Sequence, residues 1–287
     1  MPKRVDIQLA EPFSEKRLLN QGRYPLIWRP PYILQPKLNG ERCRMIVSDG
    51  RCLLLSSTAE IISSVPHINH SGLSLPDGEY DGELYVHGWT WAEIHSVVST
   101  VTTIHPKASE MQLHLFDHMN GGTQIERSIS LTHLFKGSKS LGHIHLVDPN
   151  ICFNLEQVYE CYSAYIANGY EGFIIRHVDS LYTNHRTGAM MKFKPKCTDE
   201  YQILNVYEAI SASGTGKKML GGFTCIDDMG TEFNVGAGHL SHKERMEIWW
   251  QWLDAPEEIH GKFLRVEYQV LSDKAKVPLF SRAVRII

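Results

Sequence analysis

The chain changes its pattern near Asp199, and this change constrains the architecture more than any other feature. Beyond residue 199 the segments that read as strands are short, at 201–207, 222–226, 232–235, 262–270 and 283–287. One helix interrupts them, because Ser241 and Glu244 form a capping box ahead of apolar residues at helical spacing. Five strands and one helix in fewer than 90 residues predict a small barrel. We therefore expect a barrel domain at 200–287 and a separate domain at 1–199.

Residues 1–199 mix strands and helices. Segments 41–47 and 51–56 read as two strands joined by Asp49-Gly50, a hairpin pair because both positions tolerate positive φ. Thr90, with Glu93 three residues later, predicts the start of a helix, and Asn154 predicts the start of another. This mixture favours an α+β domain of antiparallel sheets with flanking helices.

Composition excludes several classes of protein. The sequence has no run of about 18 apolar residues, so we expect no membrane-spanning segment, and residues 1–13 lack the apolar core of a secretory signal. Its six cysteines form no Cys-x-x-Cys pair, which disfavours a structural zinc site. The net charge of −3 does not by itself indicate nucleic acid, although 186–198 and 274–287 are basic without any acid. We expect a cytoplasmic monomer.

Lys37 is the first residue that suggests chemistry. It lies at a turn just before the first hairpin strand, in the segment QPKLNGER at 35–42. A lysine amine can attack phosphorus once it is deprotonated, and its pKa falls readily on desolvation or beside other cations. A turn lysine on its own is nevertheless usually an ordinary surface residue.

Four further segments strengthen this indication. DGELY at 81–85 and EGFIIR at 171–176 each place an acid and a glycine at a strand, and Phe116 could stack on a base. Lys192 and Lys194 are expected on one face of a strand, since residues i and i+2 point the same way. Two such lysines suit a triphosphate, and two carboxylates suit a divalent metal. Each segment alone is common.

Together and in this order, the segments resemble the covalent nucleotidyltransferase superfamily, and within it the ATP-dependent DNA ligases. The resemblance covers about residue 30 to the C-terminus, and the family motif K-x-D-G-x-R stands here at 37–42. It implies that Lys37 carries AMP, that Arg42 contacts the sugar or the nick, and that the Gln35 amide oxygen accepts the adenine amino group. It also implies ribose or metal binding by Glu83, adenine stacking by Phe116, metal binding by Glu171, nucleotide contact by Arg176 and phosphate binding by Lys192 and Lys194.

The C-terminal part resembles the OB-fold barrel of the same ligases. The similar segments are 216–223, 233–238 and 266–282. The basic residues expected to contact DNA are Lys217 and Lys218, in a glycine-rich loop, together with Arg282 and Arg285. RNA ligases and capping enzymes resemble this half less well, so the resemblance favours DNA.

Three departures from the family pattern are evident. Asn39 replaces the motif aspartate, which removes a charge, and 56–59 reads SSTA where the family has S-R-x-G. The chain also ends in Arg285-Ile286-Ile287 where the family usually has R-x-D-K.

The resemblance implies a complete reaction. Lys37 takes AMP from ATP, the nick 5′-phosphate takes AMP from Lys37, and the 3′-hydroxyl then displaces AMP, with magnesium (Mg2+) as the expected ion. The expected partner is nicked duplex DNA. Two alternatives stay open. One is an RNA ligase or capping-type nucleotidyltransferase, and the other is a nick-binding protein without catalysis, which only Asn39 and the chain end support.

Overall fold

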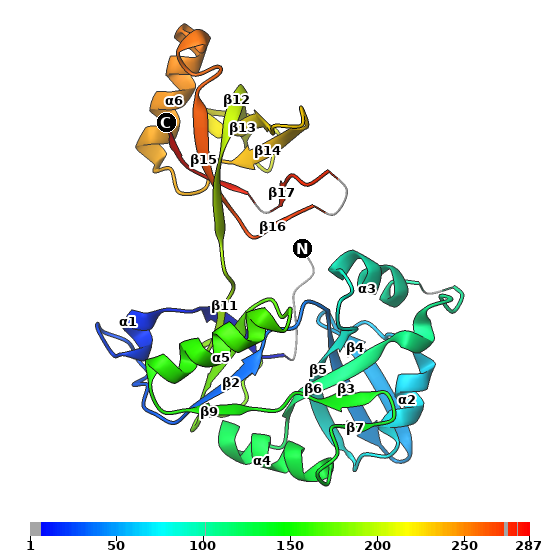
Figure 1. The fold of residues 1–287 in the computed structure, drawn as a ribbon. Coiled ribbons are helices and arrows are strands. Elements are labelled where there is room, and N and C mark those ends of the chain that lie inside the picture. The colour runs from blue at the N-terminus through cyan, green and yellow to red at the C-terminus, as the bar shows by residue number, and fades with distance from the viewer. Residues whose placement is uncertain (1–6, 101, 273–274, 280) are drawn as a thin grey trace. The chain divides into compact units, whose positions relative to one another are not determined.

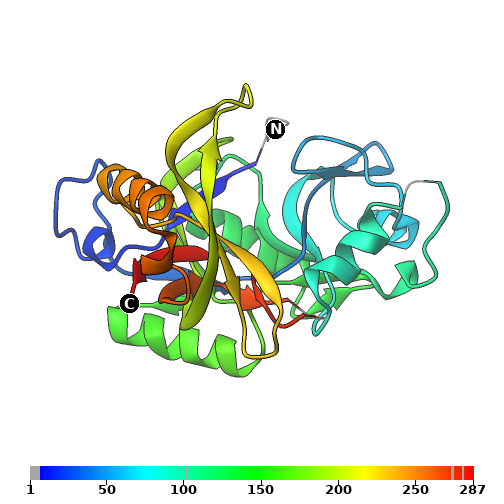
Figure 2. The same ribbon diagram turned by 90° about the horizontal axis from the view of Figure 1, so that it is seen from above.

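The computed structural model describes residues 7–100, 102–272, 275–279 and 281–287. It divides into two compact units, Met1–Phe193 and Lys194–Ile287 (Figures 1 and 2). The expected boundary near residue 199 lies inside the first barrel strand, β12 (Cys197–Ile210). Residues 197–200 belong to this strand but are all exposed, so they do not alternate between buried and exposed positions. The apolar alternation by which a strand is recognised in a sequence therefore begins only after residue 200.

Two sheets form the first unit. The six-stranded sheet runs in the order β4 (Arg51–Ser56), β3 (Glu41–Ser48), β5 (Gly78–Tyr85), β6 (Gln112–His118), β8 (Ile144–Leu146) and β7 (Ser140–Leu141). The five-stranded sheet runs in the order β1 (Leu9–Pro12), β11 (Arg186–Phe193), β10 (Phe173–His177), β2 (Tyr32–Pro36) and β9 (Asn150–Cys152). The pairs β1–β11 and β6–β8 are parallel, whereas the other described pairs are antiparallel.

Local signals in the sequence explain several of these elements. The β3–β4 hairpin turns at Asp49 and Gly50, which both have positive φ as expected. The capping box of Thr90 begins α3 (Trp91–Val98), and the Asn154 side chain caps α5 (Leu155–Ala167). The other helices are α1 (Glu15–Leu18), α2 (Pro66–Gly72), η1 (Ala108–Glu110) and α4 (Gln124–Leu134).

Each sheet buries one apolar face under helices. Cys43, Met45 and Val47 alternate along β3 into a core that also contains Ile68 of α2 and Ile94 of α3. In the five-stranded sheet, residues of β2 and β10 pack against α5 through Val158 and Tyr165. This leaves the opposite faces of the sheets to carry polar side chains.

The second unit is a closed barrel with strand order β12-β13-β14-β18-β15. Its remaining strands are β13 (Gly216–Ile226), β14 (Glu232–Gly236), β15 (Phe263–Tyr268) and β18 (Arg282–Ile286). The helix α6 (His242–Asp254) begins at the expected capping box, lies between β14 and β15 in the chain, and packs Ile248, Trp249 and Trp252 on the barrel core. The strand expected at 262–270 ends at Tyr268. After it, β16 (Val270–Leu271) pairs with β17 (Pro278–Leu279) in a separate two-stranded sheet. The short helix η2 (Pro256–Glu258) follows α6.

Within the described ranges, no helix combines the length and the apolar character that crossing a bilayer requires.

Candidate active site

Lys37 follows directly on β2 and is held by the two residues that precede β10, the strand paired with β2. Its backbone N–H donates to Gly172 O at 2.9 Å, and the Glu171 N–H donates to Lys37 O at 3.2 Å. The Lys37 ammonium forms an ion pair with the Glu171 carboxylate and donates to Leu38 O at 3.3 Å. The two side chains are 18% and 21% exposed, so the pair is largely desolvated but still reachable from solvent.

Two glycines let the lysine turn and its neighbours approach one another closely. A Cβ on Gly40 would lie 2.2 Å from Leu84 O, and one on Gly82 would lie 2.7 Å from His114 O. Both distances are far below van der Waals contact with backbone atoms that cannot move aside. The glycines thus allow the lysine motif, β5 and β6 to pack together, and this brings Glu83 within electrostatic reach of Lys37.

Arg42 lies on β3 and is bound by a carboxylate of the neighbouring strand. Its guanidinium donates two hydrogen bonds to Asp81, at 2.7 and 2.5 Å. Asp81 is fully buried and also accepts the Tyr182 hydroxyl at 2.5 Å. The sequence reasoning missed Asp81 and Tyr182, although Asp81 stands in the segment that contains Glu83.

Phe116 occupies a β-bulge. The β5–β6 ladder pairs Asp81 with Asp117 and then Gly82 with Leu115, so Phe116 has no partner on β5. A bulge re-aims the side chain of the extra residue, and bulges are frequent next to active sites. The guanidinium carbons of Arg42 and Arg176 lie 4.7 and 5.3 Å from its ring centroid. Phe116 is therefore a partly exposed aromatic surface among cations.

Behind Phe116 lies a buried network of charges. Asp117 accepts hydrogen bonds from Arg127 at 2.8 and 3.3 Å and from Arg176 at 3.2 Å, and all three side chains are at most 3% exposed. Burial is the main reason why the pKa of Arg176 is lowered, and the Asp117 charge opposes this. The sequence reasoning missed Arg127, which lies on α4. The capping box of Thr123 and Glu126 at the start of that helix is the signal that could have found it.

Glu83 is partly exposed and lies within electrostatic reach of Arg42 and Lys37. Burial raises its pKa to about 7, and the nearby cations Arg42 and Lys37 oppose this shift. At neutral pH the carboxyl group is therefore close to half protonated. In the described part of the chain, no cluster of three His, Cys, Asp or Glu side chains has the arrangement of a metal site.

The pKa of Glu83 predicts how stability depends on pH. Between its ordinary value of 4.5 and about 7 the folded state keeps a proton that the unfolded state has lost, so stability falls as pH rises through this range. Glu83→Gln carries no titratable proton and should remove this contribution. Urea midpoints of both proteins at about pH 5 and about pH 8 test this. The variant should gain stability relative to the wild type at the higher pH, and an equal difference at both values would contradict the assignment.

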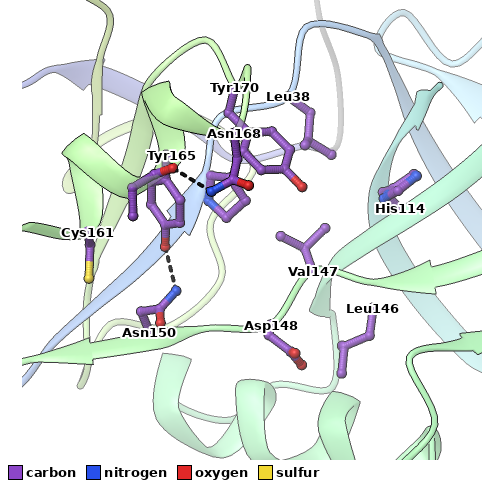
Figure 3. Close-up of a pocket in the computed structure, with 12 residues that line it drawn as sticks. Leu38, His114, Leu146, Val147, Asp148, Asn150, Cys161, Tyr165, Asn168 and Tyr170 are labelled. Carbon is purple, nitrogen blue, oxygen red and sulfur yellow. Dashed lines mark hydrogen bonds between the residues drawn. The ribbon is translucent and has the colours of Figure 1, made fainter. Parts of the chain in front are cut away.

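A cavity of about 380 Å³ borders the lysine turn (Figure 3). Pro36 and Leu38, the residues on either side of Lys37, line it together with Tyr165 and Tyr170. Asn150 donates to the Tyr165 hydroxyl at 2.7 Å in its wall. Neither Gln35 nor Phe116 contributes to the lining, so the cavity is a different place from the cluster around Phe116.

The structure corrects the expectation for the two lysines near residue 193. Lys192 lies in β11, opposite Ile174, on the sheet face that carries Arg176. Lys194 lies outside β11, because pairing with β10 ends where Phe193 meets Phe173, and it belongs to the second unit. Its ammonium donates to Gln269 at 3.4 Å. The two lysines therefore do not share a strand face.

The basic residues expected to contact DNA are all exposed on the barrel. Lys217 and Lys218 lie in the first residues of β13, so the expectation that they lie in a glycine-rich loop is wrong. The pairing of β13 with β12 is irregular there, and the Lys218 N–H donates to the Glu208 carboxylate at 2.6 Å. Arg282 and Arg285 are both on β18. Val284 between them has no partner on β15, and this shift in register leaves both arginine side chains exposed although they are three residues apart.

Comparison with known proteins agrees with this geometry. The family model described as ATP dependent DNA ligase domain matches residues 26–194, which is more than half of the chain. The DNA ligase of African swine fever virus, strain Badajoz 1971 Vero-adapted, is 27% identical over 270 residues, which cover 88% of this chain. The DNA ligase of the isolate Tick/South Africa/Pretoriuskop Pr4/1996 is 28% identical over 272 residues. The aligned part of this chain spans 62% of the length of these relatives.

Solved structures share the fold. A Lig E DNA ligase, studied for DNA binding with a minimal scaffold, superposes with a TM-score of 0.75 at 20% identity over 98% of both chains. The ATP-dependent DNA ligase of bacteriophage T7, in complex with ATP, gives 0.54 at 16% identity over 98% of both chains. These likenesses show a common mixed α+β fold. With the family match and the geometry around Lys37, they lead to one conclusion: the chain belongs to the ATP-dependent DNA ligase domain family.

Proposed function

We propose that this chain is an ATP-dependent DNA ligase that seals nicks between a 3′-hydroxyl and a 5′-phosphate through a lysyl-AMP intermediate. The observation that carries the proposal is the largely desolvated ion pair of Lys37 with Glu171, within electrostatic reach of the Glu83 carboxyl group. The partly exposed Phe116 ring lies against Arg42 of the same motif as Lys37. The Glu171 carboxylate holds the lysine side chain in one direction and can also accept its proton. Both features suit an amine that attacks phosphorus.

The first step is the transfer of AMP to Lys37. The ammonium must lose a proton before it attacks, and Glu171, which contacts it, is placed to accept that proton. The nitrogen then bonds to the α-phosphorus of ATP while the bond to the bridging oxygen breaks, and pyrophosphate leaves with the bonding electrons. In the second step a 5′-phosphate oxygen displaces Lys37 from AMP. In the third step the 3′-hydroxyl attacks the 5′-phosphorus and AMP leaves.

The remaining residues hold the nucleotide. Phe116 offers an aromatic face for the base. Arg42 lies against that ring and is paired across the strands with Glu83, so both are candidates to contact the ribose. Lys192 lies on the same sheet face as Arg176 and supplies positive charge for phosphates. Lys194 remains a candidate for the same role.

Magnesium fits the side chains near Lys37. Glu171 and Glu83 supply carboxylate oxygens, and this ion usually takes one or two protein carboxylates together with waters and substrate phosphates. Its charge would neutralise the phosphate oxygens during transfer. The absence of a three-residue cluster among the described residues is compatible with this coordination.

The two units divide the task. We assign adenylyl transfer to Met1–Phe193 and duplex DNA binding to the barrel. The barrel's strand order, with α6 between its third and fourth strands and a parallel β14–β18 contact, supports an OB-fold, which commonly binds nucleic acid. Lys217, Lys218, Arg282 and Arg285 would contact phosphates, which position a duplex without reading its sequence. The proposed form is a monomer.

Labelling with nucleotide tests the function. We expect the protein to take acid-labile label from α-labelled ATP with magnesium, and to pass it to a nicked DNA duplex that is then sealed. Label from GTP would favour a capping-type enzyme, and sealing of RNA nicks alone would favour an RNA ligase. Absence of any label with every nucleotide would refute the proposal.

A further inference from the structure

Two cysteine side chains meet at the contact between β9 and α5. Cys152 is the last residue of β9 and Cys161 lies in the middle of α5, and their Sγ atoms are 3.6 Å apart. Both are free thiols in this structure. Because a disulfide bond is about 2.05 Å long, the two sulfurs can bond to each other after a small shift.

A second contact joins the same strand and helix at a matching distance along each. Asn150 lies two residues before Cys152 on β9, and Tyr165 lies four residues after Cys161 on α5. The Asn150 side chain donates to the Tyr165 hydroxyl at 2.7 Å (Figure 3). Residues at these two spacings share a face of their element, and they span about 6.6 Å on a strand and about 6 Å on a helix. The register of β9 with α5 therefore holds the two thiols against each other.

The two sulfurs differ in their accessibility. Cys161 is partly exposed and lines the cavity beside the lysine turn, whereas Cys152 is 1% exposed. Burial raises the pKa of Cys152 to about 12, and the neighbouring Cys161 thiol adds to this shift. A thiol with such a pKa is almost never ionised at neutral pH and reacts only with a sulfur that is held against it. Cys161 is thus the sulfur that a small reagent meets first, and Cys152 is the one that can complete a disulfide.

Helix α5 leads directly to the residues that hold Lys37. The Tyr170 N–H donates to Tyr165 O at 3.0 Å, and the next two residues, Glu171 and Gly172, bond to the Lys37 backbone. Glu171 also forms the ion pair with the Lys37 ammonium. A shift of α5 against β9 is therefore passed to the lysine through a short segment that hydrogen bonds hold at both ends.

We propose that Cys152 and Cys161 form a thiol–disulfide switch, in which a low-molecular-weight disulfide oxidises both thiols to one intramolecular disulfide that slows the transfer of AMP to Lys37. Bond formation draws the sulfurs from 3.6 Å to about 2.05 Å apart and pulls α5 against β9. A displacement on the order of 1 Å at a reacting group can slow a reaction by about a hundredfold. The effect on AMP transfer rests on the proposed function, whereas formation of the disulfide does not.

The chemistry is a two-step thiol–disulfide exchange with a reagent RSSR. The Cys161 thiol loses its proton, and its sulfur attacks one sulfur of RSSR, which forms a mixed disulfide and releases RS⁻. The Cys152 thiol then loses its proton and attacks the Cys161 sulfur, which forms the protein disulfide and releases the second RS⁻. The two released thiolates take up the two protons, so two protein thiols are oxidised while one RSSR is reduced to two RSH. Excess thiol reverses both steps.

Peptide mapping by mass spectrometry tests the bond itself. The full chain carrying Cys197→Ser, which removes an exposed thiol of β12, is incubated with oxidised glutathione, alkylated and digested. We expect a pair of peptides joined through Cys152 and Cys161, which dithiothreitol separates. If both thiols stay free, or if Cys161 stays joined to glutathione, the proposal is wrong.

Labelling with ATP tests the consequence for Lys37. After oxidation the same protein should form enzyme-AMP about fivefold more slowly or less, and dithiothreitol should restore its rate. Cys161→Ser removes the attacking sulfur and should keep its rate under oxidation, and Cys161→Ala serves if the serine variant does not fold. A mapped disulfide without loss of rate, or an equal loss in the Cys161 variant, would overturn the switch. If the reduced protein takes no label, the proposed function is wrong and the effect on Lys37 falls with it, while peptide mapping still decides whether the disulfide forms.

Discussion

We expect Lys37→Ala to abolish transfer of AMP from ATP to the protein while closure of a nick that already carries a 5′-adenylate persists. Alanine offers no nitrogen to bond to phosphorus, so the first two steps lose their covalent carrier. The third step needs only the 3′-hydroxyl, the activated 5′-phosphate and the residues that position them. Labelled ATP measures the first outcome, and a synthetic adenylated nick measures the third step alone.

A second variant separates chemistry from stability. Lys37→Ala leaves the Glu171 carboxylate without its cation in a largely desolvated place, which costs stability. Lys37→Arg keeps a positive charge there but has no deprotonated form at working pH, so it should lose labelling while staying folded. Lys243→Ala, at an exposed residue of α6, is the matched control. Labelling that survives in Lys37→Arg would move the nucleophile to another residue.

Local signals in the sequence predicted much of the fold because they need no distant partner. The positive φ of Asp49 and Gly50 and the caps at Thr90, Asn154 and Ser241 each depend on a few neighbouring residues. The five barrel strands also follow from local alternation. The strand ends were less predictable, since the end of β11 at Phe193 coincides with the start of its distant partner β10 at Phe173.

The residues around Lys37 were predicted more completely than the residues that hold them. Lys37 and Glu171 belong to recognisable motifs, and the structure brings them into contact although 134 positions separate them. Asp81 pairs with Arg42 and Arg127 pairs with Asp117, but nothing in a single sequence says which buried acid meets which base. The bulge at Phe116 likewise depends on the register with β5. Supporting contacts of this kind arise from tertiary pairing and not from spacing.

Replacing Glu171 should strongly slow the formation of enzyme-AMP. Glu171→Gln keeps the size of the side chain and a hydrogen-bonding group near Lys37, but it cannot take the lysine proton and is a poor ligand for a divalent ion. We expect the rate of enzyme-AMP formation to fall by about two orders of magnitude or more, as is typical when a proton acceptor or a metal ligand is removed. Glu156→Gln, at an exposed residue in the first turn of α5, should keep the wild-type rate.

Titration with magnesium distinguishes the two roles of Glu171. If the carboxylate mainly binds the ion, Glu171→Gln needs more magnesium for half of its maximal rate, and excess magnesium restores part of the lost rate. If it mainly accepts the proton of Lys37, the magnesium requirement stays the same and the rate of the variant rises with pH until Lys37 deprotonates by itself. A variant within about threefold of the wild type, a difference below roughly 1 kcal/mol in activation free energy, would remove Glu171 from both roles. The contact with Lys37 would then serve only to hold the turn against β10.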